Sequence, residues 1–160
     1  RLRLIGASVT DRDALVEARD TVLSAFGIPS VLVNNAGIDQ PPSAAGGGSR
    51  LEEIPAEVNR RIFEVNTLAP LRMIQACLPM LRAGRGRVVN ISSMNGYISL
   101  PMVGAYSASK FALEALSDAL RIELRPWNIP ISLIRPGQVG TAIFDKARQR
   151  NAPDDSLPPA

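Results

Sequence analysis

Residues 87–93 read RVVNISS, an apolar run that ends in two adjacent serine hydroxyls. Two further runs have the same form, because VLV at residues 31–33 precedes Asn-Asn-Ala-Gly and ISLI at residues 131–134 precedes Arg-Pro-Gly. Longer stretches in which apolar residues follow helical spacing separate these three runs. Short apolar strands that alternate with helices are typical of βαβ units and a parallel sheet. The sequence therefore predicts the α/β fold class.

The limits of the other elements are set by helix caps, prolines and glycines. Besides the predicted strands at residues 31–33, 87–91 and 131–134, we expect a strand at residues 2–5 and a helix capped by Thr10 or Asp11 and ended by Gly27. We also expect a mobile loop at residues 38–50, a helical stretch at residues 51–82 interrupted near Asn66 and Pro70, and a helix at residues 106–124. At 160 residues the chain suits one domain, which we expect over residues 1–150, followed by a disordered tail at residues 151–160.

Charge and composition argue against nucleic-acid binding. The chain has 18 basic and 15 acidic residues, a net charge of +3 and a pI near 9.6. The basic residues are spread along the chain, and only Arg82, Arg85 and Arg87 cluster, around two glycines between a helix and a strand. Aromatic residues make up 4% of the chain, too few to build a surface on which bases stack. We therefore expect no nucleic-acid partner.

Metal binding and membrane spanning are not expected either. The chain contains no histidine and a single cysteine, Cys77, so the usual ligands of a zinc site are missing. Cys77 lies in a helical pattern and is interpreted as a buried thiol in the reducing cytoplasm. No apolar run reaches the roughly 20 residues that a membrane span requires.

Tyr106 and Lys110 lie four residues apart, which places them on one face at the start of a predicted helix. Reduction of a carbonyl needs a proton donor beside the oxygen, and the reverse reaction needs a base. Free tyrosine, with a pKa of about 10, is a poor base at neutral pH. A nearby ammonium favours the phenolate, so the pair predicts a tyrosine whose pKa is lowered toward the working range.

Ser93 and Asn66 are further candidate site residues. Ser93 follows the strand at residues 87–91, at the end where open α/β sheets bind ligands, and its hydroxyl can donate to a substrate carbonyl. Its neighbour Ser92 is the alternative from position alone. Asn66 lies within a helical pattern, where asparagine is disfavoured because its side chain competes for backbone hydrogen bonds. An ordinary surface asparagine is the alternative at that position.

In their order and spacing, Asn34-Asn35-Ala36-Gly37, Asn66, Ser93, Tyr106 and Lys110 resemble the short-chain dehydrogenase/reductase family. The resemblance covers about residues 4–145. It implies a Rossmann-like doubly wound parallel sheet, incomplete here because the first two strands of the family fold are absent. It also implies an NAD(P)-dependent oxidoreductase that interconverts an alcohol and a carbonyl by hydride transfer.

The resemblance also implies roles for individual residues. Tyr106 is the general acid/base, Lys110 its electrostatic partner and ribose anchor, and Ser93, by the family spacing, the carbonyl donor. Asn66 holds a water that connects the lysine to solvent. The expected contacts of the cofactor, NAD or NADP, are Ser8, Val9, Asn35, Ala36, Gly37, Tyr106, Lys110, Pro136, Gly137, Val139 and Thr141.

The family's glycine-rich phosphate-binding segment has no counterpart. Ile5-Gly6-Ala7-Ser8 looks like its start, but Val9-Thr10-Asp11 follows without the glycines that open a helix around phosphate. The spacing to Asn34 instead matches the family's Asp-Val-Thr-Asp segment, with Ser8 in place of the aspartate that contacts adenine. The chain is therefore interpreted as an interior fragment of a longer enzyme. A catalytically inactive truncated product is the alternative function.

Substrate, assembly and location are implied only by resemblance. The stretch from Tyr106 to Glu114 looks most like family members that act on retinoid- or steroid-like alcohols, so a lipophilic small-molecule substrate is expected. The helices at residues 66–82 and 106–124 correspond to those that pair across family dimers, so a homo-oligomer is expected, and a helix-mediated dimerisation module is a third possible function. A cytoplasmic location is expected.

Overall fold

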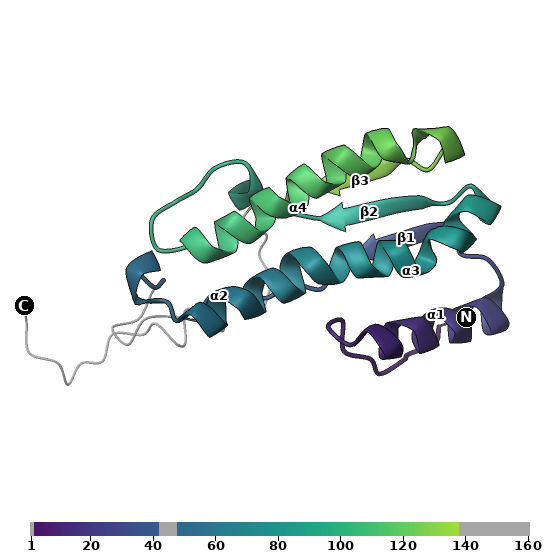
Figure 1. Cartoon of the computed structure of the whole chain (residues 1–160), viewed down its shortest axis with the longest axis horizontal. Helices are drawn as coiled ribbons and strands as arrows, with labels where there is room; N and C mark the ends of the chain where they lie inside the picture. Colours follow the sequence, from purple (N-terminus) through teal and green to yellow (C-terminus); the bar gives the residue numbers. More distant parts are fainter. Residues whose placement is uncertain (1, 42–47, 138–160) are drawn as a thin grey trace, which may run out of the picture.

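The computed structural model describes residues 2–41 and 48–137, and its centre is a parallel three-stranded sheet (Figure 1). The strands are β1 (Val31–Asn34), β2 (Arg87–Ile91) and β3 (Ile131–Ile134), in the order β1-β2-β3. Val31 pairs with Arg87 and Val88 pairs with Ile131, so all three strands end at the same edge. The predicted strands and their parallel arrangement are confirmed. Within the described ranges β1 pairs with β2 alone, which leaves its outer edge without a partner strand.

Helix α1 (Arg12–Phe26) precedes the sheet and has both of its ends fixed by local chemistry. The Asp11 carboxylate accepts hydrogen bonds from the backbone N–H groups of Asp13 and Ala14, so Asp11, and not Thr10, is the cap. Gly27 ends the helix with φ of 78°, a conformation that residues with a side chain rarely adopt. The predicted end at Gly27 is confirmed.

The long helical stretch is divided where the sequence predicts an interruption. After a short 3₁₀ turn (Leu51–Glu53), α2 (Ala56–Phe63) continues into a π-helical turn (Glu64–Leu68) and then into α3 (Ala69–Gly84). Asn66 is at the centre of the π turn. Pro70 is in the first turn of α3, where a missing N–H costs no helical hydrogen bond. The interruption is therefore a widened turn that still connects two helices on one axis.

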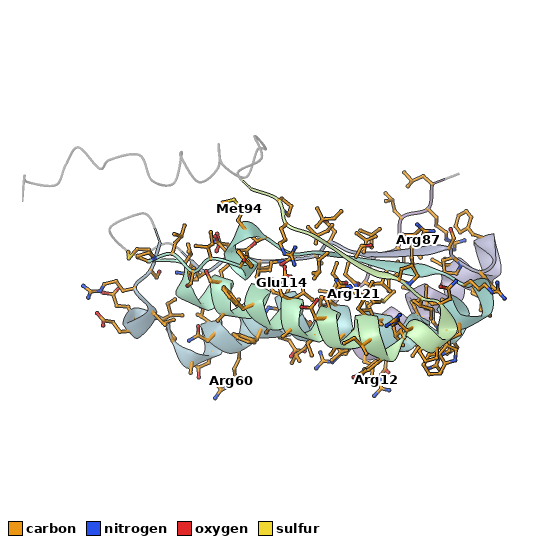
Figure 2. All side chains as sticks on the ribbon, turned by 90° about the horizontal axis from the view of Figure 1, so that it is seen from above. Arg12, Arg60, Arg87, Met94, Glu114 and Arg121 are labelled. Atoms are coloured by element: carbon orange, nitrogen blue, oxygen red, sulfur yellow. The ribbon has the colours of Figure 1, made fainter. Side chains whose placement is uncertain are left out.

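Helix α4 (Gly104–Glu123) lies between β2 and β3 in the chain, with 3₁₀ turns before it (Met94–Gly96) and after it (Arg125–Trp127). Helices α3 and α4 lie side by side in Figure 1, and the view turned by 90° in Figure 2 shows the helices on one face of the sheet. Their apolar sides and the strands form the main core, whose buried members are Ile74, Cys77, Met80, Leu81, Val88, Leu124, Ile129 and Ile131. Cys77 is buried, as the sequence predicted.

The predicted strand at residues 2–5 is wrong. The structure places residues 2–8 in irregular backbone along α1, and Leu2 and Leu4 are each 88% exposed. A strand gains its stability from pairing with a neighbour, and no described strand accepts this segment. The apolar pattern Leu2-Arg3-Leu4-Ile5 is therefore insufficient to form a strand here. The predicted tail at residues 151–160 lies outside the described residues.

Candidate active site

The site is built at the carboxyl edge of the sheet, where polar residues follow neighbouring strands. Asn34 and Asn90 are paired in register, and the Asn34 side-chain amide donates to Asn90 Oδ1 over 2.8 Å. This contact fixes the ends of β1 and β2 against each other. Asn35 and Ser93 follow these two strand ends, so both lie at one edge, as the sequence predicted.

The first turns of α4 bring Tyr106 and Lys110 to the same edge. The Lys110 ammonium lies 5.7 Å from the centre of the Tyr106 ring and donates to the carbonyl oxygen of Ile91, at the end of β2, over 2.9 Å. Lys110 is only 4% exposed. A buried lysine with a single carbonyl partner is held in one position, and it places a cation beneath the phenol.

Asn66 is completely buried, with an exposed fraction of 0%, and its side chain connects two distant segments. Its Oδ1 accepts from the Ile38 N–H over 2.8 Å, and its Nδ2 donates to the Ile38 carbonyl over 2.8 Å and to Ser109 Oγ over 3.0 Å. Both Nδ2 hydrogens are thus used by protein groups. The widened π turn presents this amide toward α4 and the chain after β1.

Gly37 lies between the polar groups of this cluster. A Cβ placed on Gly37 would lie 3.5 Å from Asn66 Oδ1 and 3.6 Å from Lys110 Nζ. The absence of a side chain therefore leaves a small space that both polar atoms face. Asn66 Oδ1, which accepts one hydrogen bond from the Ile38 N–H, faces Gly37 from the same side as Lys110 Nζ.

Burial, rather than Lys110, has the largest effect on the pKa of Tyr106. Burial raises the pKa of the Tyr106 phenol, a hydrogen bond with the Ser93 side chain lowers it, and the Asp39 carboxylate raises it further. The net direction is upward, so the predicted lowering of this pKa by Lys110 is wrong for the structure. Burial also lowers the pKa of Lys110, and the Glu114 carboxylate partly offsets this.

Gln40 is a site residue that sequence reasoning missed. It is 7% exposed, and its Nε2 donates to the backbone carbonyls of Ser49 and Met102. Its Oε1 accepts from the Tyr106 N–H over 3.4 Å, one of the first N–H groups of α4, which have no partner within the helix. Gln40 thus ties the chain after β1 to the turn that carries Tyr106. Its position in a predicted loop gave no signal for this role.

The predicted cofactor contacts are partly brought together. A cavity of about 190 Å³ lies between α1, α3 and the end of β1, and Val9, Asn35 and Ala36 line it together with apolar side chains. Pro136 accepts a hydrogen bond from the Met94 N–H over 3.1 Å, which joins the chain after β3 to the turn after Ser93. Ser8 is exposed, and its hydroxyl is hydrogen-bonded to Thr10 Oγ1. Val139 and Thr141 lie outside the described residues.

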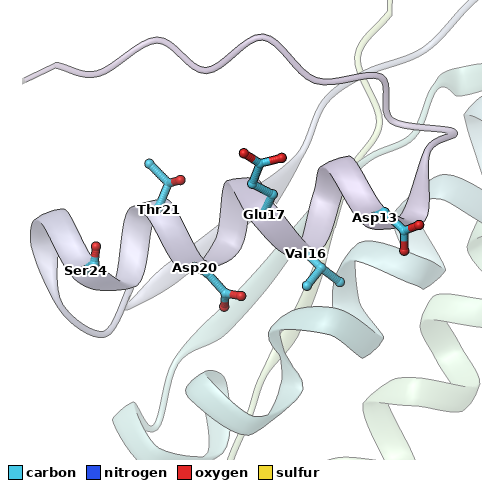
Figure 3. A pocket seen from close by; sticks show the side chains of 6 residues that line it. All are labelled: Asp13, Val16, Glu17, Asp20, Thr21 and Ser24. Carbon is cyan, nitrogen blue, oxygen red and sulfur yellow. The ribbon is translucent and has the colours of Figure 1, made fainter.

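The carboxyl edge thus fits a flat dinucleotide in part. Gly37 leaves backbone open beside Lys110, and the cavity reaches the Asn35–Ala36 backbone. A larger hollow of about 590 Å³ lies on α1 between acidic side chains and contains none of the predicted site residues (Figure 3). No group of three or more potential metal ligands occurs within the part of the chain that the structure describes, and no described helix is long and apolar enough to cross a membrane.

Comparison with known proteins identifies the family. The family model for short chain dehydrogenases matches residues 1–152. The chain belongs to the short-chain dehydrogenase family. The family is one of oxidoreductases, and its solved structures have the Rossmann-like α/β fold that the sequence predicted. The three-stranded sheet described here is an open part of that fold.

Individual short-chain dehydrogenases match most of this chain. The 3-ketodihydrosphingosine reductase of Bacteroides thetaiotaomicron is 36% identical over 149 residues, which cover 91% of this chain and 52% of that protein. An alcohol dehydrogenase from Thermococcus sibiricus, solved with 5-hydroxy-NADP, is 30% identical with a TM-score of 0.75, covering 85% of this chain and 54% of that one. A xylitol dehydrogenase solved with NAD⁺ is 29% identical with a TM-score of 0.78, covering 86% and 51%. The chain spans about half the length of the relatives that it matches.

Proposed function

We propose that this chain supplies the catalytic residues of an NAD(P)-dependent oxidoreductase that interconverts an alcohol and a carbonyl. The observation that carries the proposal is the meeting of Tyr106, Ser93 and Lys110 at the carboxyl edge, where Ser93 acts on the phenol and Lys110 lies beneath its ring. Two hydroxyls and an ammonium at one edge form a proton donor, a second hydrogen-bond donor and a cation, which is what reduction of a carbonyl requires.

The proposed proton transfer runs through Tyr106. During reduction the phenol gives its proton to the substrate oxygen as that oxygen gains negative charge, and Ser93 donates a second hydrogen bond to the same atom. When bound, a nicotinamide cofactor would supply the hydride in this direction and accept it in the other. Lys110 stabilises the phenolate that remains, and the space beside Gly37 admits a water that returns a proton from solvent. In oxidation the same phenolate removes the hydroxyl proton.

The raised pKa of Tyr106 favours reduction near neutral pH. A phenol whose pKa lies above its usual value of about 10 is protonated at pH 7 and is ready to donate. Oxidation needs the phenolate, which burial disfavours. At neutral pH Tyr106 is therefore proposed to be in the form that donates a proton during carbonyl reduction, and the B. thetaiotaomicron relative is named a reductase.

The residues proposed to hold the cofactor are those brought to this edge. Asn35, Ala36 and Gly37 present open backbone, Lys110 presents its ammonium to a ribose, and Val9 faces the cavity on the adenosine side. Pro136 and Gly137 face the other side of the site. Both NAD and NADP remain open for this chain, because the matched structures contain NAD⁺ in one case and an NADP derivative in the other.

A lipophilic substrate is favoured by the surface beside Ser93. Met94, Tyr97 and Ile98 are exposed and line a hollow of about 250 Å³ together with Arg135. An apolar surface next to a proton donor suits a substrate with a hydrocarbon portion. The named substrate of the B. thetaiotaomicron relative, 3-ketodihydrosphingosine, is a ketone of this general kind.

The substitution Tyr106→Phe tests the catalytic proposal. In the longer enzyme of which this chain is proposed to be a part, removing one hydroxyl should lower turnover by about 100-fold or more, because the proton donor is lost, while cofactor affinity stays nearly constant. Steady-state kinetics and cofactor titration of both proteins measure the two effects. Turnover above about a tenth of the original rate would exclude Tyr106 as the acid/base, whereas loss of cofactor binding would mean that the site itself is disrupted.

A second proposal concerns the 160-residue chain alone, which we propose to be catalytically inactive. No glycine-rich turn opens a helix within residues 2–41, and the outer edge of β1 has no partner strand among the described residues. A pyrophosphate is usually held by bare N–H groups at such a turn. Calorimetry on this chain should therefore show only weak binding of NAD(H) or NADP(H). A micromolar dissociation constant, about −8 kcal/mol, would refute this proposal.

Helix-mediated dimerisation is a compatible third proposal. Helix α4 carries Phe111 and Ile122 at its surface, 42% and 71% exposed, and Leu68 in the π turn is 39% exposed. Apolar side chains on a helix at the surface suit pairing with the same helix of a second copy. Analytical ultracentrifugation at two concentrations measures this assembly independently of activity.

A further inference from the structure

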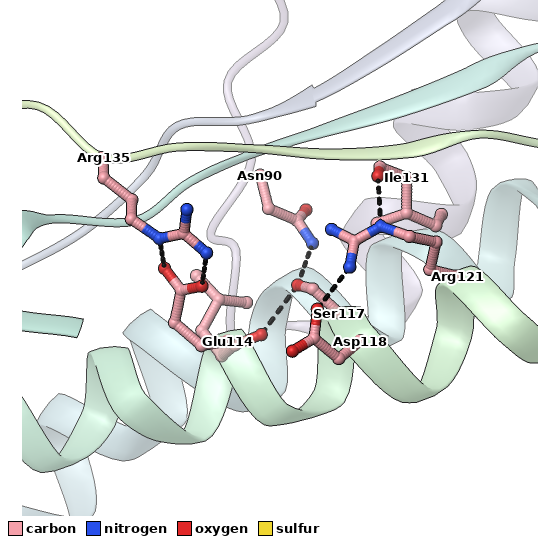
Figure 4. Close-up of polar contacts among 8 residues, drawn as sticks. Asn90, Glu114, Ser117, Asp118, Arg121, Ile131 and Arg135 are labelled. Atoms are coloured by element: carbon pink, nitrogen blue, oxygen red, sulfur yellow. Dashed lines mark hydrogen bonds and ion pairs between the residues drawn. The ribbon is translucent and has the colours of Figure 1, made fainter. Parts of the chain in front are cut away.

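Glu114 and Arg135 form a two-pronged ion pair beside the site (Figure 4). Arg135 Nε donates to one carboxylate oxygen over 2.9 Å, and Arg135 Nη2 donates to the other over 2.6 Å. The Glu114 side chain is 12% exposed and the Arg135 side chain 47%. A planar guanidinium that grips both oxygens of a largely buried carboxylate fixes direction as well as distance.

The same carboxylate is packed against the turn that follows Ser93. A Cβ placed on Gly96, in the Met94–Gly96 turn, would lie 3.1 Å from Glu114 Cγ and 3.2 Å from Glu114 Oε1. The backbone of this turn therefore rests directly on the Glu114 side chain. Gly96 is required there, because any side chain would displace the carboxylate or the neighbouring Ser92 hydroxyl, which would lie 2.7 Å away.

Glu114 thus touches three segments that carry site residues. Its own helix, α4, carries Tyr106 and Lys110. Arg135 directly follows β3 and precedes Pro136–Gly137, whose carbonyl at Pro136 receives the Met94 N–H. The Met94–Gly96 turn follows Ser93. A single carboxylate therefore sets the separation of Ser93 from the helix that carries Tyr106.

Glu114 also lies one helical turn after Lys110, on the same side of α4. The other groups around Lys110 are uncharged: the Ile91 carbonyl accepts a hydrogen bond from the ammonium, and Asn66 and Tyr106 are neutral at pH 7. The Asp39 carboxylate acts on Tyr106 from the chain after β1, and Arg135 lies on the far side of Glu114. Glu114 is the carboxylate that offsets the burial of Lys110.

We propose that Glu114 is a positioning residue of the active site: its carboxylate holds Arg135, the turn after Ser93 and α4 in one arrangement, and places a negative charge one helical turn from the Lys110 ammonium. This inference rests on the proposed function of Tyr106, Ser93 and Lys110. The Glu114–Arg135 ion pair therefore arranges the site, whereas an ordinary surface ion pair contributes only to the stability of the fold.

The charge is tested by titrating Lys110 alone. The chain has two lysines, so Lys146→Arg leaves Lys110 as the single lysine, and ¹³Cε-labelled lysine reports its protonation by NMR. In this background Glu114→Gln should lower the Lys110 titration midpoint by about one pH unit, as expected for the loss of a nearby opposite charge. Asp118→Asn is the matched control, because Asp118 is also an arginine-paired acid on α4, with Arg121 as its partner, but lies two helical turns from Lys110 instead of one. It should leave the midpoint unchanged.

The geometry is tested by titrating Tyr106 alone. The chain has two tyrosines, so Tyr97→Phe leaves Tyr106 as the single phenol, and its ionisation is followed by ultraviolet absorbance. Arg135→Lys keeps the charge and loses the two-pronged grip. It should raise the Tyr106 midpoint toward the value reached by Ser93→Ala, because the Ser93 hydrogen bond that lowers this pKa is weakened.

Each titration can overturn the proposal on its own. An unchanged Lys110 midpoint in Glu114→Gln removes the charge role, and an unchanged Tyr106 midpoint in Arg135→Lys, with a shift in Ser93→Ala, removes the positioning role. Circular dichroism checks that each variant is folded. If Glu114→Gln does not fold, the Arg135→Lys titration of Tyr106 still tests the positioning role. Neither titration needs substrate or cofactor, so a failure of the proposed dehydrogenase activity would be seen separately.

Discussion

Replacing Asn66 by alanine should destabilise the fold through the loss of one buried amide. The Asn66 side chain makes hydrogen bonds with the Ile38 N–H, the Ile38 carbonyl and the Ser109 hydroxyl, and none of its atoms is exposed to solvent. Each hydrogen bond contributes roughly 1 kcal/mol, and a buried backbone group left without a partner costs about 1–3 kcal/mol. Asn66→Ala should therefore lower the free energy of unfolding by about 3–4 kcal/mol.

Urea unfolding followed by tryptophan fluorescence measures this loss. Trp127 is the single tryptophan, and the Arg82 guanidinium lies 3.9 Å from its ring, so its emission should change when the core opens. Asn59→Ala is the control, because Asn59 is a partly exposed asparagine in the neighbouring helix α2. It should change stability by less than about 0.5 kcal/mol. A loss below about 1 kcal/mol in Asn66→Ala would refute the assignment of a structural amide at the π turn.

Two further predictions concern Gly37 and Lys110. In the longer enzyme that contains this chain, Gly37→Ala should fold normally, because the added methyl meets Asn66 Oδ1 and Lys110 Nζ only at ordinary contact distances. It should nevertheless slow turnover at least about tenfold by filling the space proposed for the relay water. Full activity of a folded variant would exclude that path. Burial lowers the pKa of Lys110, so between this lowered pKa and about 10.5 the unfolded chain binds more protons and stability rises with pH. Lys110→Met should abolish this rise in urea midpoints measured from about pH 8 to 10.5, and a rise that persists in the variant would contradict the burial of Lys110.

The strands and the long helices could be predicted because their signals are local. Runs of β-branched residues that end in Asn, Ser or Pro-Gly predicted β1, β2 and β3, and Arg125-Pro126 predicted the end of α4 to within two residues. Residues 2–5 show the limit of such signals. Their apolar pattern matches that of a strand, but a strand is stable only when it pairs with another strand. A four-residue pattern does not indicate which strand that partner would be.

The candidate site was predicted as a set of residues but not as a set of contacts. Asn66 was identified because asparagine is disfavoured inside helices, yet its partners Ile38 and Ser109 are 28 and 43 residues away in the chain. Gln40 and Glu114 gave no local signal, since their roles depend on which segments pack against them. The pKa of Tyr106 was misjudged for the same reason: Lys110 is visible four residues along the chain, whereas burial is a property of the packed molecule.

Asn66, Gln40 and Glu114 have one structural consequence in common, because each ties a different segment to α4. Asn66 ties the chain after β1 to Ser109, Gln40 ties it to the Tyr106 N–H, and Glu114 ties Arg135 and the turn after Ser93. Helix α4 is therefore the reference to which the remaining site residues are aligned. A shift of this helix would move Tyr106 and Lys110 together and leave their mutual distance unchanged, while it would separate both from Ser93. Substitutions of Asn66, Gln40 or Glu114 should for this reason weaken the contact between Ser93 and Tyr106 before they affect the Tyr106–Lys110 pair.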